Sequence, residues 1–125
     1  MKDKNYLVEV ATESGDRETT TKFIVSAPCA VTAGHYGIYL MAYDPANLEW
    51  EDDLEAAADS DYHYLHTLWQ SEEIETGEIE TLKKHMPSYK HNTTDLNKCG
   101  EYEELRFIQL DCAKEASVKK QQLVQ

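Results

Sequence analysis

Residues 6–25 carry the pattern that most constrains the fold, because they predict a β-hairpin at the start of the chain. In the first run, Tyr6, Val8 and Val10 recur at every second position and define one apolar face. Residues 13–17 follow as a turn-rich loop that contains glycine and has the length of a hairpin connection. The chain is therefore expected to begin with two antiparallel strands.

The second run, residues 19–25, is rich in β-branched and aromatic side chains, which favour strands. Phe23 and Val25 fall on one side of this run and are expected to join the apolar face of the first strand. Pro28 should end the ladder, because proline cannot donate a backbone hydrogen bond.

Residues 29–43 fit two structures. Four small or apolar residues share one face at helical spacing: Ala30, Gly34, Gly37 and Met41. Residues 36–43 also read as a good strand, and the two glycines and three tyrosines favour that strand over the helix. Since neither face of the strand would be polar, we expect a third strand that is central or covered on both faces.

Residues 44–87 are expected to form an acidic helical region. An aspartate followed by proline at positions 44 and 45 is a strong helix start signal. Apolar residues then recur at helical spacing, which predicts a largely helical segment over residues 46–69: Leu54, Ala58, Tyr62, Leu65 and Trp69. A short helix is predicted over residues 78–86, and the proline that follows should end it.

Residues 88–100 are expected to form a polar loop, and residues 101–120 a final helix. A strand through Arg106, Ile108 and Leu110 is the competing interpretation of the last segment. The chain as a whole, residues 1–125, predicts a single domain in which residues 1–43 are mainly strands. Strands followed by helices favour an α+β fold. The expected architecture is a small antiparallel sheet, made of the N-terminal hairpin plus a third strand, packed by C-terminal helices.

Charge is distributed unevenly along the chain. The sequence has 24 acidic and 12 basic residues, which gives a formal net charge of -12. No lysine or arginine occurs in the 60 residues from 23 to 82, whereas 13 aspartates and glutamates do. A surface of one sign repels nucleic acids and anionic membranes and attracts basic proteins. The composition therefore argues against direct nucleic-acid and membrane binding and favours a basic protein partner.

The acidic residues of this window, with the aromatic residues among them, form the expected partner-binding site. Like charges at i,i+4, such as Glu51 and Glu55, destabilise a helix by roughly 0.2–0.5 kcal/mol per pair, so selection for stability alone would dilute them. Aromatic side chains near the acids would act as rigid anchors. The residues assigned to the site are Glu49, Trp50, Glu51, Asp52, Asp53, Glu55, Asp59, Asp61, Tyr62, Tyr64, Glu72, Glu73 and Glu75.

These features predict a non-enzymatic acidic protein that inhibits or neutralises a basic protein, such as a nuclease or another nucleic-acid-binding protein. Two mechanisms fit: charge-steered docking, and mimicry of the DNA phosphate backbone. In size and charge alone, the chain is similar to nuclease-toxin immunity proteins and to phage-encoded inhibitors of host defence. No motif links it to a family, and no cofactor is expected.

Two enzymatic alternatives and one structural alternative stay open. Cys29 and His35 are the candidate nucleophile and base, although acidic surroundings would raise the thiol pKa. His63 and His66, with Asp59 one turn before them, could hold a divalent metal, but the pattern lacks a further ligand and no metal is expected. The structural alternative is an accessory subunit whose acidic face only confers solubility.

Cysteine usage and hydropathy bear on the compartment. Three cysteines without tight spacing favour reduced thiols in a cytosol. No apolar run approaches the ~18 residues of a membrane helix. Residues 1–6 lead into the first strand without a signal-peptide apolar region. A cytoplasmic protein is expected, and its oligomeric state is left open.

Overall fold

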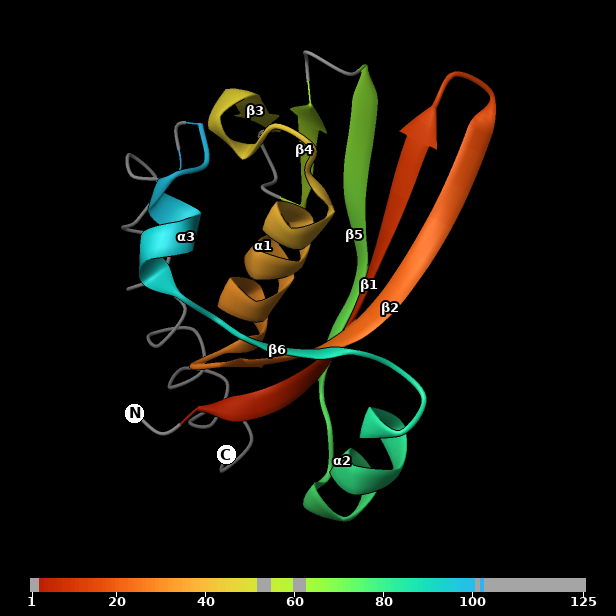
Figure 1. Cartoon of the computed structure of the whole chain (residues 1–125), viewed down its shortest axis with the longest axis vertical. Helices are drawn as coiled ribbons and strands as arrows, with labels where there is room; N and C mark the ends of the chain where they lie inside the picture. Colours follow the sequence, from red (N-terminus) through yellow and green to blue (C-terminus); the bar gives the residue numbers. More distant parts are fainter. Residues whose placement is uncertain (1–2, 52–54, 60–62, 101, 103–125) are drawn as a thin grey trace, which may run out of the picture.

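The computed structural model describes residues 3–51, 55–59, 63–100 and 102. Along these residues the chain alternates strands and helices rather than placing the helices at its end (Figure 1). The elements are β1 (Lys4–Ser14), β2 (Arg17–Ala27), α1 (Ala30–Met41), the 3-10 helix η1 (Pro45–Asn47), β3 (Leu48–Trp50), β4 (Ala56–Asp59), β5 (Tyr64–Glu73), α2 (Thr76–Lys83), β6 (Ser88–Lys90) and α3 (Thr93–Asn97).

The strands of the described residues form one six-stranded sheet in the order β3-β4-β5-β1-β2-β6. From β3 to β2 each strand pairs antiparallel with its neighbour in the sheet, and β6 lies parallel to β2. The α+β class is therefore confirmed. The expected small antiparallel sheet of three strands is wrong, because the sheet is larger and mixed, and the expectation of mainly C-terminal helices is wrong because the helices interleave with the strands.

The N-terminal hairpin is confirmed. β1 and β2 pair along their whole length, from Lys4 opposite Ala27 to Ser14 opposite Arg17. Gly15 in the two-residue turn has φ 64°, a left-handed conformation that suits glycine in tight hairpins. β2 ends just before Pro28, as the missing backbone donor of proline requires.

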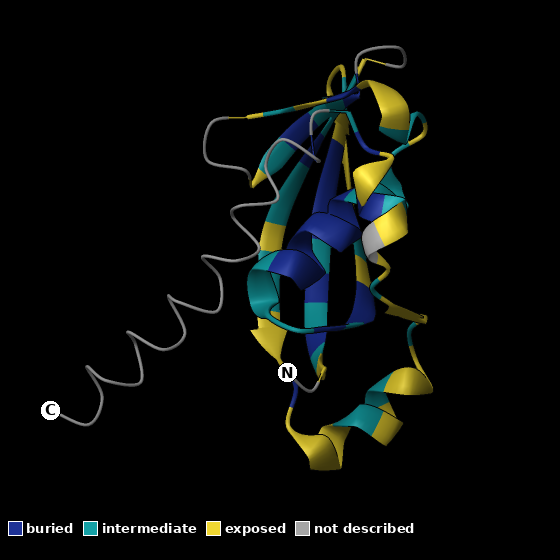
Figure 2. Ribbon diagram, turned by 90° about the vertical axis from the view of Figure 1, so that its left-hand side faces the viewer, coloured by how far each residue is buried: buried dark blue, intermediate teal, exposed yellow. Residues whose placement is uncertain are grey.

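The third strand expected within residues 29–43 is wrong, because this segment forms α1. In Figure 1 α1 lies across one face of the sheet, and Figure 2 shows buried residues where the helix meets the strands. The buried apolar side chains from these elements form the core: Tyr6, Val8, Val10, Phe23, Val25, Ala27, Ala33, Tyr36 and Ile38. Residues 30–41 carry apolar side chains on all sides because they form a helix that is largely buried, and not a strand that is covered on both faces.

Two glycines explain why the helix can lie so close to the sheet. A Cβ at Gly37 would come within 2.6 Å of Val8 Cγ1, and a Cβ at Gly34 would collide with Leu68. Glycine at these positions therefore serves helix–sheet contact rather than strand formation, which is why propensity alone gave the wrong element.

The largely helical segment expected over residues 46–69 is also wrong. The start signal at Asp44 and Pro45 yields only the short η1, and the described remainder forms β3, β4 and most of β5. The three strands pair antiparallel in a meander, from Leu48 opposite Asp59 to Asp59 opposite Tyr64. Glu51 and Glu55 lie at the connection between β3 and β4, where the Glu51 N–H donates to the Ala56 carbonyl at 2.9 Å.

The C-terminal expectations have mixed outcomes. The short helix expected over residues 78–86 is confirmed as α2, which begins two residues earlier and lies away from the sheet (Figures 1 and 2). The polar loop expected over residues 88–100 is wrong in part, because it contains β6 and α3. Of the helix expected over residues 101–120, only Tyr102 is described, and the rest lies outside the described residues. No described helix has the length and apolar character needed to cross a bilayer.

Substitution of Gly37 by alanine should destabilise the protein. The added methyl group would overlap Val8 and Phe23, and overpacking of this kind costs typically about 1–3 kcal/mol. The matched control is Gly77→Ala in α2, where nothing lies within 4 Å of the added carbon and the free energy of unfolding should stay the same or rise by up to about 1 kcal/mol. Urea denaturation of both variants checks this, and equal stabilities would contradict the close helix–sheet contact.

Candidate protein-binding surface

The acidic residues assigned to partner binding do not share a helical face, because the helix does not exist. Glu49 and Glu72 point away from α1, whereas Glu73, on the opposite side of the alternation, points towards the α1 face of the sheet. Six assigned glutamates are exposed: Glu49, Glu51, Glu55, Glu72, Glu73 and Glu75. Four assigned residues lie outside the described residues: Asp52, Asp53, Asp61 and Tyr62.

Several of the exposed acids nevertheless border one strand. Glu72 and Glu73 end β5, and Glu75 immediately precedes α2. The backbone carbonyl of Glu55 accepts a hydrogen bond from the Leu68 N–H at 2.7 Å, which places Glu55 beside the middle of β5. The outer side of β5, away from β1, therefore carries acids along much of its length.

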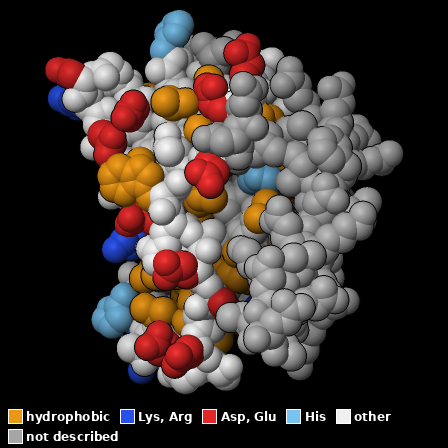
Figure 3. All heavy atoms as spheres, turned by 180° about the vertical axis from the view of Figure 1, so that it is seen from behind, with side chains coloured by type: hydrophobic (Ala, Val, Ile, Leu, Met, Phe, Trp, Pro, Cys, Tyr) orange, Lys and Arg blue, Asp and Glu red, His pale blue; other side chains and the backbone are white. Residues whose placement is uncertain are grey.

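No lysine or arginine lies in β3, β4 or β5. The nearest recorded cation is Lys4 of β1, whose Nζ lies 3.2 Å from Glu73 Oε1 in an exposed ion pair. Exposed pairs of this kind contribute about 0–1 kcal/mol and leave the excess negative charge in place. Figure 3, which views the molecule from behind, shows acidic side chains from top to bottom of this face and basic ones at its left margin.

Asp59 belongs to the core and not to the binding surface, so its assignment was wrong. Its side chain is fully buried. Oδ2 accepts backbone N–H groups from Tyr43 at 2.8 Å and from Asp44 at 3.1 Å. A buried carboxylate is tolerated when it accepts such bonds. Asp59 thereby ties the segment that follows α1 to strand β4.

His66 lies next to Asp59 in the same buried cluster. Its Nδ1 is 2.9 Å from the Thr12 hydroxyl, and its Nε2 is 3.7 Å from Asp59 Oδ2. Burial lowers the pKa of His66, and the Asp59 carboxylate only partly opposes this effect. A neutral imidazole in polar contact with Asp59 is therefore a better description at neutral pH than an ion pair.

The row of side-chain contacts from Thr12 through His66 to Asp59 resembles a catalytic arrangement of nucleophile, base and acid. The burial of the three side chains argues against that chemistry, because a substrate could not reach them. His66 and Asp59 are fully buried, and Thr12 is 8% exposed. A substrate would have to reach the threonine hydroxyl through the core. The cluster is therefore better explained as a structural link between β1, β4 and β5.

The two assigned aromatic residues that are described are both half-buried. Trp50 packs against His35 and Tyr102, with ring centroids 5.3 and 5.4 Å away. Tyr64 stacks on Tyr43 at 4.9 Å, and Tyr43 itself is 63% exposed. Trp50 is thus mainly a packing residue, whereas the Tyr43–Tyr64 pair presents part of its surface to solvent.

Trp69 is the exposed aromatic residue that sequence reasoning placed in the wrong environment. It was assigned to the apolar stripe of a helix, whereas its side chain is 54% exposed. In the pairing of β5 with β1, Glu9 lies opposite Gln70 and Val10 opposite Leu68, so Trp69 is the extra residue of a β-bulge. A bulge reverses the alternation of the strand, and no pattern in the sequence marked it.

A hollow of about 260 Å³ lies beside Trp69. It is lined by the first two residues of α1, by Glu55 and by residues 68–71. β4 pairs with β5 only up to Ala56 opposite Thr67, so the hollow begins where that pairing stops. The hollow is thus bordered by the exposed Trp69 ring, by Glu55 and by the edge of β5.

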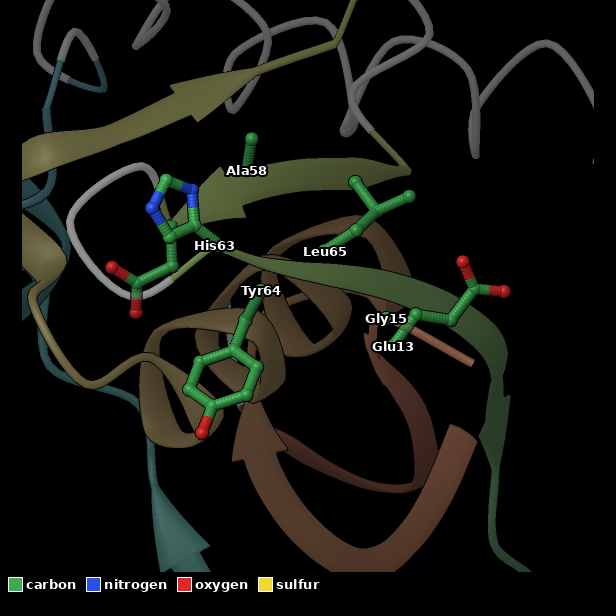
Figure 4. Close-up of a pocket in the computed structure, with 7 residues that line it drawn as sticks. Glu13, Gly15, Ala58, His63, Tyr64 and Leu65 are labelled. Atoms are coloured by element: carbon green, nitrogen blue, oxygen red, sulfur yellow. The ribbon is translucent and has the colours of Figure 1, made fainter. Parts of the chain in front are cut away.

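A second hollow, of about 580 Å³, lies at the other end of β5 (Figure 4). Glu13, Ala58, His63, Tyr64 and Leu65 are among its lining residues. Figure 4 shows the Glu13 carboxylate pointing away from the His63 ring, so the two groups do not converge on one point. The hollow offers surface for contact but no converging catalytic groups.

The enzymatic alternatives gain no support from the described residues. Cys29 takes part in a disulfide bond, so the expectation of reduced cysteines is wrong at Cys29, which is no free nucleophile. His35 is buried and bonds the Tyr102 hydroxyl through Nδ1 at 3.1 Å. Cys99 is a free thiol, but burial raises its pKa to about 12. Within the described ranges, no three His, Cys, Asp or Glu residues are grouped to hold a metal ion.

No protein-family model matches this chain, and neither the search of curated proteins nor the search of solved structures gave a significant match. Fold and surface therefore have to be interpreted from the residues of this chain alone.

Removal of the Asp59 carboxylate should destabilise the protein strongly. Asp59→Ala leaves two backbone N–H groups without their acceptor, and each unsatisfied buried donor costs about 1–3 kcal/mol. Asp59→Asn keeps an acceptor oxygen and should lose less stability. The control is Glu49→Ala on the exposed side of β3, expected within about 0.5 kcal/mol of the parent. Chemical denaturation measures all three, and a mild Asp59→Ala effect would contradict the structural role.

Stability should decrease as the pH falls through the ordinary histidine pKa of about 6.5. Burial holds the pKa of His66 lower in the folded state, so the unfolded chain takes up a proton that the folded chain does not. The free energy of unfolding should therefore fall by at most about 1.4 kcal/mol per pH unit for this group, until the pH passes the folded-state pKa.

His66→Gln should flatten this pH dependence, because it removes a group that binds a proton more readily in the unfolded chain. Burial lowers the pKa of His91 as well, so part of the slope is expected to persist in the His66 variant. Denaturation curves between pH 5 and 8, the range in which histidine titrates, measure the effect. An unchanged slope in His66→Gln would show that His66 does not titrate as its burial requires.

Proposed function

We propose that this protein is a non-enzymatic acidic binding protein that inhibits or neutralises a basic partner. The partner class that fits best is a nucleic-acid-binding or nucleic-acid-cleaving protein, because such proteins carry clustered lysines and arginines. The observation that carries the proposal is the half of the sheet formed by β3, β4 and β5. It has no cation, and exposed glutamates lie along it and next to it.

Charge supports binding in two ways. A net charge of -12, with no lysine or arginine between positions 23 and 82, gives the molecule a field that attracts basic surfaces. Such steering can raise association rates by about 10- to 1,000-fold at low salt. The acids occur on both faces of the sheet rather than in one row, which supports charge-steered docking over mimicry of a regular phosphate backbone.

Exposed aromatic groups beside the acids supply anchoring area. Trp69 is 54% exposed, and the ring of an exposed tryptophan can hold a lysine or arginine side chain by a cation–π interaction. Tryptophan and tyrosine are also enriched among the residues that dominate binding energy at interfaces. Partner contacts centred on Trp69 would therefore combine desolvation of a ring with charge complementarity.

A charge-driven inhibitor should lose affinity when the acids of this half of the sheet are neutralised. We expect the combined variant Glu49→Gln, Glu51→Gln, Glu72→Gln and Glu75→Gln to bind its partner at least about tenfold more weakly and with a shallower salt dependence. The partner is first captured from host lysate at low salt and eluted with a salt gradient. Its affinity is then measured by calorimetry across salt concentrations.

The matched control neutralises four acids elsewhere: Asp3→Asn, Asp16→Asn, Glu18→Gln and Glu80→Gln. Both variants change the net charge by the same amount, so only position differs. If both weaken binding equally, overall charge and not this surface drives association. If neither does, or if no basic protein is captured, the acids serve solubility alone and the proposal fails.

A further inference from the structure

We infer that the outer edge of β5, from Trp69 to Glu73, binds an extended basic segment of the partner protein by β-strand addition. The inference rests on the proposed function, because it assigns the way in which an acidic binder would hold its basic partner. β-strand addition uses main-chain hydrogen bonds for affinity and side-chain contacts for selectivity. Three features of β5 carry it: the direction of its backbone groups, the space beside it and its charge.

The backbone direction follows from the pairing of β5 with β1. The N–H of Ile74 donates to the Asn5 carbonyl at 2.9 Å, and hydrogen-bonded pairs alternate along antiparallel strands. Gln70 and Glu72 therefore direct their backbone groups towards β1. Ser71 and Glu73 direct theirs to the opposite, outer edge.

Within the part of the chain that the structure describes, strand pairing at this outer edge stops halfway along β5. β4 pairs with β5 up to Thr67, and the bond from the Leu68 N–H to Glu55 is the last recorded contact of the ladder. Among the described residues, no hydrogen bond to the backbone of Ser71 or Glu73 is recorded on that side. The Ser71 hydroxyl donates to the Ala30 carbonyl at 2.6 Å, so the side chain is held by α1 and does not bond the outward backbone groups of Ser71.

Space exists beside the same edge. The hollow next to Trp69 is lined by residues 68–71 and holds about 260 Å³. Another hollow, of about 490 Å³, is lined by residues 73–76. The two hollows follow one another along the chain, on either side of Glu72. A strand placed against Ser71 would meet the hollow beside Trp69.

Charge selects the occupant. Glu72, Glu73 and Glu75 flank the edge, and no basic residue lies in β5 or β4. Lys4 of β1 pairs with Glu73, which leaves Glu72 and Glu75 as the excess negative charge. A second copy of this chain would bring glutamates against glutamates, and like charges placed opposite each other destabilise strand pairs. An extended segment with alternating lysine or arginine would meet opposite charge and could lay a cationic side chain on the Trp69 ring.

Amide hydrogen exchange with two charge-matched peptides tests the inference on the unaltered protein. The probes are acetyl-(Lys-Val)4-amide, which can pair as a strand, and acetyl-(Lys-Pro)4-amide made with backbone N-methylated lysines, in which neither lysine nor proline can donate to a ladder. With the first peptide, exchange at Ser71 and Glu73 should slow at least about tenfold, whereas Gln70 and Glu72, already bonded to β1, should change little. The second peptide should bind at least about tenfold more weakly.

Two variants at Ser71 separate its backbone from its side chain. Ser71→Pro removes the outward N–H and should weaken (Lys-Val)4 binding about three- to tenfold, with no effect on (Lys-Pro)4. Ser71→Ala keeps the N–H, loses only the bond to Ala30 and should bind like the parent. If Ser71→Pro does not fold, the hydrogen-exchange measurement on the parent protein still tests whether the peptide pairs with β5.

The outcomes also separate this inference from the proposed function. Equal affinity for both peptides, without slowed exchange at Ser71 and Glu73, overturns strand addition while charge-driven binding survives. If neither peptide binds, strand addition is overturned as well. The proposed function is then tested separately, by capture of a basic partner from lysate. Slow exchange at Ser71 and Glu73 without peptide, together with a dimer in sedimentation, would show that a second copy occupies the edge and would equally overturn it.

Discussion

The fold depends on β1, which is hydrogen-bonded along both of its edges. One edge pairs with β2 over the whole strand, and the other pairs with β5. Because a strand alternates its side chains, this double pairing fixes Tyr6, Val8 and Val10 on the face that α1 covers. The helix can then approach only where glycine leaves room, at Gly34 against Leu68 and at Gly37 against Val8. Sheet register and helix position are thus set together.

The same pairing creates the candidate site. Between Glu9 and Val10 the register with β5 shifts by one residue, and the extra residue is Trp69. A bulge bends its strand and increases the local twist, which gives a physical reason for the pairing of β4 to stop near this point. The exposed ring and the end of the strand pairing seen among the described residues are therefore both explained by one irregularity in the ladder between β1 and β5.

Only the parts of the fold that depend on local patterns could be predicted from the sequence. The hairpin and α2 were predictable, because alternation, a turn glycine and terminating prolines act over a few residues. α1 was not, since Gly34 and Gly37 were judged by propensity although they serve contact with distant strands. The i,i+4 repulsion between Glu51 and Glu55 was taken as a sign of function, whereas it was evidence against the helix itself.

For the candidate surface, the sequence indicates the excess of acidic residues but not their geometry. Acidic excess is a property of composition and survives any error in secondary structure, so the exposed glutamates of β3–β5 were found. Burial of Asp59 and exposure of Trp69 depend on which face of a strand each residue occupies. A helical period of 3.6 residues does not match the period of two in a strand, so it does not tell which side chains of the strand are buried. A bulge then exchanges the two faces for the residues that follow it.

Charge and the unpaired edge have to be considered together. An exposed strand edge promotes association between copies, and proteins commonly protect such edges with charged side chains. Either sign would protect, because like charges repel in any pairing of identical copies. Here the sign along the edge is negative at Glu72, Glu73 and Glu75, so the same side chains that exclude another copy of the chain favour a basic segment. Under the proposed function, solubility and partner selection would therefore both follow from the charge of this edge.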